Sequence, residues 1–124
     1  MRPNKKTIFF TAFLCWAFSC LYAQKETEVF IPLGKSPGVS NKYSVIGKVE
    51  TVNINDSVII ITQDANIKTC KINSRTEVYL DKSNLKLTNT KGSFADIKKG
   101  QLVEAKYKDN KPSDVIEWFK VKIE

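Results

Sequence analysis

The residues from position 43 onward predict an all-β fold class: a small antiparallel barrel of five to six short strands with one short helical turn. Two observations carry this expectation. Apolar and polar residues alternate with a period of two in short segments rich in β-branched side chains, and turn-forming residues separate these segments. A barrel is favoured over an open sheet because closure removes the exposed edges that a sheet of this size would otherwise present.

The first predicted strand covers residues 43–51. Val45 and Val49 share one face with Gly47, whereas Lys48 lies on the opposite face. Such alternation is typical of a strand with one buried and one exposed face. Glycine inside a strand often marks a bend or a bulge, so we expect the strand to curl at Gly47.

Two more strands follow the first in a meander. Residues 53–57 carry the Asn, Asp and Ser residues typical of a turn. The segment 58–62 is apolar on both faces, which predicts a central strand. After a second turn, residues 67–72 predict the third strand, and a short strand at 78–80 follows it.

The second half of the domain begins with an irregular polar stretch at 81–92. Ser93 and Asp96 then have the spacing of a capping box, which predicts a single helical turn. Residues 101–108 and 115–123 alternate apolar and polar side chains and predict the last two strands, joined by a hairpin loop.

The chain before these strands divides into two parts. Residues 24–42 are polar and contain Pro and Gly, which predicts a flexible arm or linker, with a short edge strand at residues 29–31. Residues 1–23 have a basic start, an uncharged apolar run and Ala23 at their end, the three-part pattern of a secretory signal peptide. The predicted domains are therefore 1–23, 24–42 and 43–124.

Three fates are open for the first segment. The favoured one is cleavage after Ala23, which yields a periplasmic or secreted protein. In the second, residues 17–20 act as a degenerate lipobox, and lipidation at Cys20 anchors the protein. An uncleaved anchor is the third fate, and it is disfavoured because the apolar run is shorter than the ~20 residues that span a bilayer.

Cleavage after Ala23 changes the net charge and the number of cysteines of the protein. Three of the twenty basic residues and none of the thirteen acidic ones precede residue 24, so the net charge falls from +7 to +4. This mild basicity permits attraction to anionic surfaces. Cys70 becomes the only cysteine, which excludes an internal disulfide framework. Its position in a strand predicts a buried small side chain, with a reactive thiol as the alternative.

The residue types present argue against catalysis. The chain has no histidine, so it lacks Ser-His and Cys-His catalysis and histidine metal sites. It has no glycine-rich phosphate loop and no calcium-loop spacing. We therefore expect that the protein is not an enzyme and that it binds no metal and no cofactor. A carboxylate pair such as Glu104 and Glu117 is the one enzymatic alternative.

Strand alternation places one group of cations and an aromatic ring on the outer face of the predicted barrel. Cations can hold a polymer backbone while a ring stacks on bases or sugars, so this group is a candidate binding surface. The alternative is an ordinary outer face on which Trp118 is covered by the 24–42 arm. The candidate residues are Lys48, Lys106, Lys108, Trp118, Lys120 and Lys122.

The strand pattern favours the oligonucleotide/oligosaccharide-binding (OB) architecture, with an SH3-like barrel or an antiparallel sandwich as alternatives. Residues 45–52 (VIGKVETV) and 94–105 (FADIKKGQLVEA) resemble two hallmarks of exported bacterial OB-like domains catalogued as domain of unknown function family 5666. The resemblance implies a fold and an exported location, and it carries over no catalytic residue.

These observations together predict an exported, non-catalytic binding or interaction module of the bacterial envelope, whose ligand is unknown. The alternative is a structural subunit or envelope stability factor that acts through protein–protein contact. An anionic polymer or an envelope protein is the expected partner, and export argues against nucleic acid. Membrane contact is expected only through the signal peptide or a lipid anchor on Cys20.

Overall fold

The computed structural model describes residues 27–124. The predicted signal peptide, its cleavage site after Ala23 and the lipidation candidate Cys20 lie outside the described residues. Among residues 27–124, no helix has the length and apolar character needed to cross a membrane.

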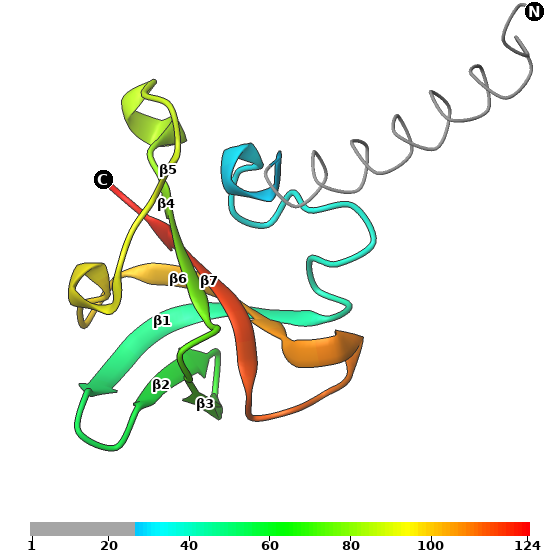
Figure 1. Ribbon diagram of the computed structural model, residues 1–124, viewed down its shortest axis with the longest axis vertical. Helices are drawn as coiled ribbons and strands as arrows, with labels where there is room; N and C mark the ends of the chain where they lie inside the picture. Colours follow the sequence, from blue (N-terminus) through cyan, green and yellow to red (C-terminus); the bar gives the residue numbers. More distant parts are fainter. Residues whose placement is uncertain (1–26) are drawn as a thin grey trace, which may run out of the picture.

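The described chain forms one seven-stranded sheet, which confirms the all-β fold class (Figure 1). The strands follow the order β3-β2-β1-β6-β7-β4-β5 across the sheet. Every neighbouring pair is antiparallel except β4 and β7, which are parallel. The strands are β1 (Ser44–Asn53), β2 (Val58–Gln63), β3 (Asn66–Lys71), β4 (Glu77–Asp81), β5 (Thr90–Lys91), β6 (Leu102–Tyr107) and β7 (Ile116–Lys122).

The connectivity is that of an OB-like barrel whose third strand is broken into β3 and β4. β1 lies between β2 and β6, and the β6–β7 hairpin returns beside it, with β7 parallel to β4. The ladder does not close completely, because β3 and β5 form its two ends. A single parallel bridge between Lys71 and Val115 joins the end of β3 to the residue before β7. OB barrels are partly open in this manner.

Within residues 27–124, four short 3-10 turns accompany the strands, where the sequence predicted one helical turn. They are η1 (Glu28–Phe30), η2 (Ser83–Leu85), η3 (Phe94–Asp96) and η4 (Lys108–Asn110). The capping box at η3 is confirmed, since the Ser93 backbone N–H donates to Asp96 Oδ2 at 2.8 Å. The edge strand expected at residues 29–31 is corrected, because this segment forms η1 and lies against β4 and β5.

The core lies on the inner face of the barrel, as the alternation of β6 and β7 predicted. Val103, Ala105, Phe119 and Val121 are completely buried there. Cys70 is buried in the same cluster, as expected of a small apolar side chain, and burial raises the pKa of its thiol to about 12. Such a thiol is not a nucleophile near neutral pH.

β1 curves across the molecule, and Gly47 is required where it meets β2 (Figure 1). A Cβ atom on Gly47 would lie 2.3 Å from the carbonyl oxygen of Thr62, so no side chain fits at this crossing. The bulge itself is at Glu50 and not at Gly47, because Val49 pairs with Ile61 and Thr51 with the adjacent Ile60.

Candidate functional site

The outer face of β6 and β7 carries polar and aromatic side chains. Lys106 pairs with Trp118 across the two strands, and Glu104 pairs with Lys120. These residues alternate with the core residues, so their side chains project away from the barrel interior. The direction predicted from the sequence is therefore correct.

Residues 27–42, the described part of the 24–42 segment expected as a flexible arm or linker, pack over this outer face. The Leu33 backbone N–H donates to Asp81 Oδ2 at 2.8 Å, and the Gly34 N–H donates to Glu104 Oε1 at 2.9 Å. The Ser44 hydroxyl donates to Glu104 Oε2 at 2.6 Å. Three hydrogen bonds to carboxylates thus hold the arm and the start of β1 in place, and Glu104 is completely buried beneath them.

Lys120 is the centre of this contact. Its side chain is only 1% exposed, and its ammonium group donates to Glu28 Oε1 at 2.7 Å and to Ser36 Oγ at 2.9 Å. The ammonium nitrogen also lies 4.6 Å from the centroid of the Trp118 ring. Burial of a charge is costly unless it is paired and hydrogen-bonded, and the arm supplies both partners.

Trp118 packs within a second small apolar cluster that joins the arm to the barrel. Val29 of η1 and Tyr79 of β4 are its buried partners, and the two rings lie 6.0 Å apart with an interplanar angle of 45°. Burial and a hydrogen bond from the Tyr79 hydroxyl to Glu77 raise the pKa of Tyr79, so the phenol stays protonated.

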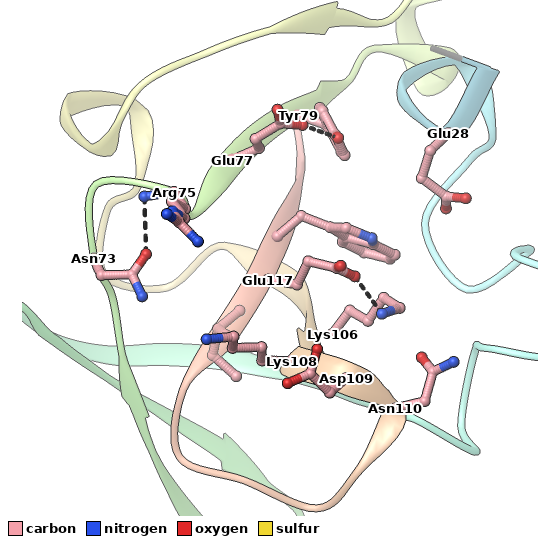
Figure 2. A pocket seen from close by; sticks show the side chains of 12 residues that line it. Glu28, Asn73, Arg75, Glu77, Tyr79, Lys106, Lys108, Asp109, Asn110 and Glu117 are labelled. Atoms are coloured by element: carbon pink, nitrogen blue, oxygen red, sulfur yellow. Dashed lines mark hydrogen bonds and ion pairs between the residues drawn. The ribbon is translucent and has the colours of Figure 1, made fainter. Parts of the chain in front are cut away.

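A cavity of about 620 Å³ opens beside this cluster (Figure 2). Its strand residues come from β4, β6 and β7, and they are Glu77, Tyr79, Lys106, Ile116, Glu117 and Trp118. Figure 2 shows Glu117 between the Asn73–Arg75 turn on one side and Glu28 of the arm on the other.

A bulge in β7 directs Glu117 into the cavity. Lys106 pairs with Trp118, but the next residue of β6, Tyr107, pairs with Ile116, which leaves Glu117 as the extra residue. Glu117 and Trp118 can therefore both face outward although they are adjacent in sequence. The carboxylate of Glu117 forms an ion pair with Lys106, which lies on the cavity wall (Figure 2).

Two loops complete the rim of the cavity. The β6–β7 connection contributes Lys108, Asp109 and Asn110, and the last two adopt left-handed backbone angles with φ of 59° and 52°. Asp and Asn tolerate this conformation better than most residues. The β3–β4 turn contributes Arg75, which is exposed. Within residues 27–124, neither Arg75 nor Lys108 forms an ion pair.

The six predicted binding residues divide into two groups. Lys106, Lys108 and Trp118 line the cavity, whereas the remaining three do not. The alternative interpretation, in which the arm covers Trp118, matches the structure: Lys106, Trp118 and Lys120 are 8%, 5% and 1% exposed because the arm and neighbouring side chains cover them. Lys48 and Lys122 lie outside the cavity, exposed and half-buried respectively.

Sequence reasoning missed most of the cavity. Its remaining polar residues come from the arm, the β3–β4 turn, β4, the β6–β7 loop and the bulge in β7. No periodic pattern links such dispersed positions. The missed polar residues are Glu28, Asn73, Arg75, Glu77, Asp109 and Asn110. Glu117 was named only as the partner of Glu104 in a carboxylate pair, and Glu104 does not line the cavity.

Comparison with known proteins yields no family for this chain. No family model and no curated protein matches it. Among solved structures, the crystal structure of Ag(I)CusF matches with a TM-score of 0.42 and 17% sequence identity. The match covers 63% of this chain and 93% of that chain. Among the described residues, no group of three or more His, Cys, Asp or Glu side chains is placed to hold a metal ion.

Proposed function

We propose that this protein is an exported, non-catalytic binding module whose ligand occupies the cavity beside Trp118. The observation that carries the proposal is convergence. Two aromatic side chains and polar groups from three strands, two loops and the arm meet around one space of about 620 Å³. Small-molecule sites typically enclose roughly 300–1,000 Å³ and combine apolar surface with a few placed polar groups.

The cavity wall is organised before any ligand arrives. Tyr79 and Trp118 are buried and packed on each other, and Lys106 is held by Glu117. A ligand entering such a site orders few additional side chains, which lowers the entropic cost of binding. This supports recognition of a ligand at a preformed surface.

Three of the four carboxylates around the cavity favour binding over catalysis, because each is held by a neighbouring group. Glu117 is paired with Lys106, Glu28 with Lys120, and Glu77 accepts a hydrogen bond from Tyr79. Each of these interactions fixes a carboxylate against a neighbouring group. A general acid or nucleophile instead needs a carboxylate directed at a substrate atom.

Export is proposed from residues 1–23, with a periplasmic or secreted protein as the favoured product and a Cys20-anchored protein as the alternative. Mass spectrometry of the protein recovered from an expressing bacterium distinguishes them. An amino terminus at Gln24 supports cleavage after Ala23, and a lipid-modified Cys20 supports the anchor. An intact amino terminus at Met1 in the cytoplasm would contradict export.

Nuclear magnetic resonance tests the site. We expect a fragment library of sugars, nucleosides and small amides to give hits whose shifts map to Asn73–Glu77, Lys106–Asn110 and Glu117. The fluorescence of Trp118 offers a second readout, since Trp16 is the only other tryptophan and leaves with the signal peptide. Hits that map only to surfaces outside the cavity, such as the segment 82–91 that contains η2 and β5, would refute the assignment of the cavity.

Light scattering and cross-linking in cells test the alternative of a structural subunit. A stable homo-oligomer in light scattering, or an envelope protein cross-linked to the cavity rim, would favour protein–protein contact over ligand binding.

A further inference from the structure

We propose that the ligand of this cavity is an uncharged, polyhydroxylated molecule, namely a short neutral oligosaccharide. This inference rests on the proposed function and names the class of ligand for the same site. It differs from the anionic polymer that the overall basicity of the chain suggests.

The cavity is lined by charges of both signs in similar number. Its lining contains three cationic side chains and four carboxylates, so the excess of lysine in the chain as a whole does not reach this site. Two of the carboxylates, Glu117 and Glu28, are engaged by Lys106 and Lys120. Binding of a polyanion depends on cations free to neutralise its phosphates or carboxylates. An anionic ligand here would meet Glu77 and Asp109 as well as Arg75 and Lys108.

The hydrogen-bonding groups suit hydroxyls. Carboxylates accept hydrogen bonds, Arg75 and Lys108 donate them, and the amides of Asn73 and Asn110 do both. A sugar hydroxyl also donates and accepts, so neighbouring hydroxyls on one ring can satisfy both kinds of group. An anion can only accept hydrogen bonds and a cationic group can only donate them, so neither would satisfy both the carboxylates and the basic side chains of the cavity.

Apolar surface is present beside these groups. Ile116, Tyr79 and Trp118 line the same cavity, and the two rings meet at a tilt of 45°. These three side chains are 1%, 4% and 5% exposed, so a sugar ring would touch only their edges with its C–H groups while its hydroxyls reach the polar rim. Cavities that combine apolar and aromatic lining with placed polar groups are the common form of small-molecule sites.

An extended peptide fits this site less well. Peptides that add to a sheet pair with an unpaired strand edge. The cavity instead lies over the face of β4, β6 and β7, and each of these strands has a neighbouring strand on both sides. The ligand must therefore be held by side chains, as an oligosaccharide is.

The experiment titrates the processed, exported protein with neutral tetrasaccharides (cello-, malto-, manno- and chitotetraose), tetragalacturonate and single-stranded oligothymidylate. Calorimetry gives affinity, and amide shifts locate binding. We expect at least one neutral tetrasaccharide to bind in the cavity with an affinity that changes less than about twofold between low and physiological salt, since no counterions are released.

Arg75→Gln and Lys99→Gln provide a matched pair. Both side chains are exposed and neither forms an ion pair among the described residues, but only Arg75 lines the cavity. We expect Arg75→Gln to weaken the neutral tetrasaccharide about tenfold, the effect of one lost hydrogen bond to a charged group, while Lys99→Gln binds like the parent.

The outcomes separate the two proposals. Cavity shifts caused only by tetragalacturonate or oligothymidylate, with strong salt dependence, would overturn the neutral ligand and leave the binding module intact. Equal affinity of Arg75→Gln and the parent for a neutral tetrasaccharide would also overturn the inference. If no probe of any class shifts the cavity resonances, both proposals fail.

Discussion

The ion pair between Lys120 and Glu28 allows a test of how the arm is held. The two partners differ in exposure: the Lys120 side chain is 1% exposed, whereas that of Glu28 is 22% exposed. Glu28→Ala therefore leaves a buried ammonium group with Ser36 as its one remaining hydrogen-bond partner. Lys120→Met leaves a carboxylate that can turn toward water and replaces the amine by an apolar chain of similar length.

This asymmetry sets the expected magnitudes. Removing one partner of a buried ion pair costs about 3–5 kcal/mol, and the partial exposure of Glu28 places Glu28→Ala at roughly 3 kcal/mol. Replacing a buried charge by an apolar side chain of similar volume is often close to neutral, so Lys120→Met should cost less than about 1.5 kcal/mol. The double variant should be more stable than Glu28→Ala alone, because it no longer contains an unpaired buried charge.

Urea unfolding, followed by Trp118 fluorescence, measures these differences. For a slope of ~1–2 kcal/mol per M, a loss of 3 kcal/mol lowers the midpoint by roughly 1.5–3 M. Lys98→Ala, at an exposed position of the η3–β6 connection, is the control and should stay within about 0.5 kcal/mol of the parent. The reasoning is refuted if Glu28→Ala costs no more than Lys98→Ala, or if Lys120→Met costs as much as Glu28→Ala.

Three further predictions follow from single groups. Gly47→Ala should lower stability by about 3 kcal/mol or more in urea, because its Cβ would overlap the Thr62 carbonyl. Cys70 should react with a thiol reagent at pH 8 only after denaturation, since burial raises its pKa to about 12, and labelling of the native protein would contradict this. Asp81 is subject to burial, which raises its pKa, but hydrogen bonds from Ser83 and Leu33 and the charge of Lys120 lower it overall. Its contribution to stability is therefore present above its unfolded pKa of about 3.9 and is lost as pH falls through the lower folded pKa. Asp81→Asn should therefore make the urea midpoint depend less on pH below about pH 5.

The alternation of the strands was the strongest signal in the sequence because burial on one face is a local property. Val103 and Ala105 in β6, and Phe119 and Val121 in β7, occupy the core as their spacing predicted. The capping box at η3 was equally readable, since both partners lie within one turn. Features of this kind require no knowledge of the rest of the fold.

Pairings between distant segments were not readable in the same way. The parallel alignment of β4 with β7 joins residues about forty positions apart, such as Val78 and Phe119. Alternation specifies which face is buried but not which strand lies alongside. The two-residue strand β5 was also missed, because two residues show no period.

The sequence left two interpretations of Trp118 open, and the structure shows which of the two describes its surroundings. An aromatic residue among lysines is compatible with an exposed binding face and with a packed residue under the arm. The contacts with Val29 and Tyr79 place Trp118 in a buried cluster, with only its border on the cavity. What determines its exposure is the docking of the arm, and a linker-like composition rich in Pro and Gly does not predict docking.

The arm and the proposed site are not independent. Glu28 pairs with Lys120 and also lines the cavity, so it belongs both to the contact that holds the arm and to the surface that would meet a ligand. A ligand that contacts Glu28 binds only the docked form of the arm and must stabilise that form by linkage. Any substitution of Glu28 would therefore change arm docking and ligand affinity together. Arg75, on the opposite rim and outside the contacts that hold the arm, reports on ligand affinity alone.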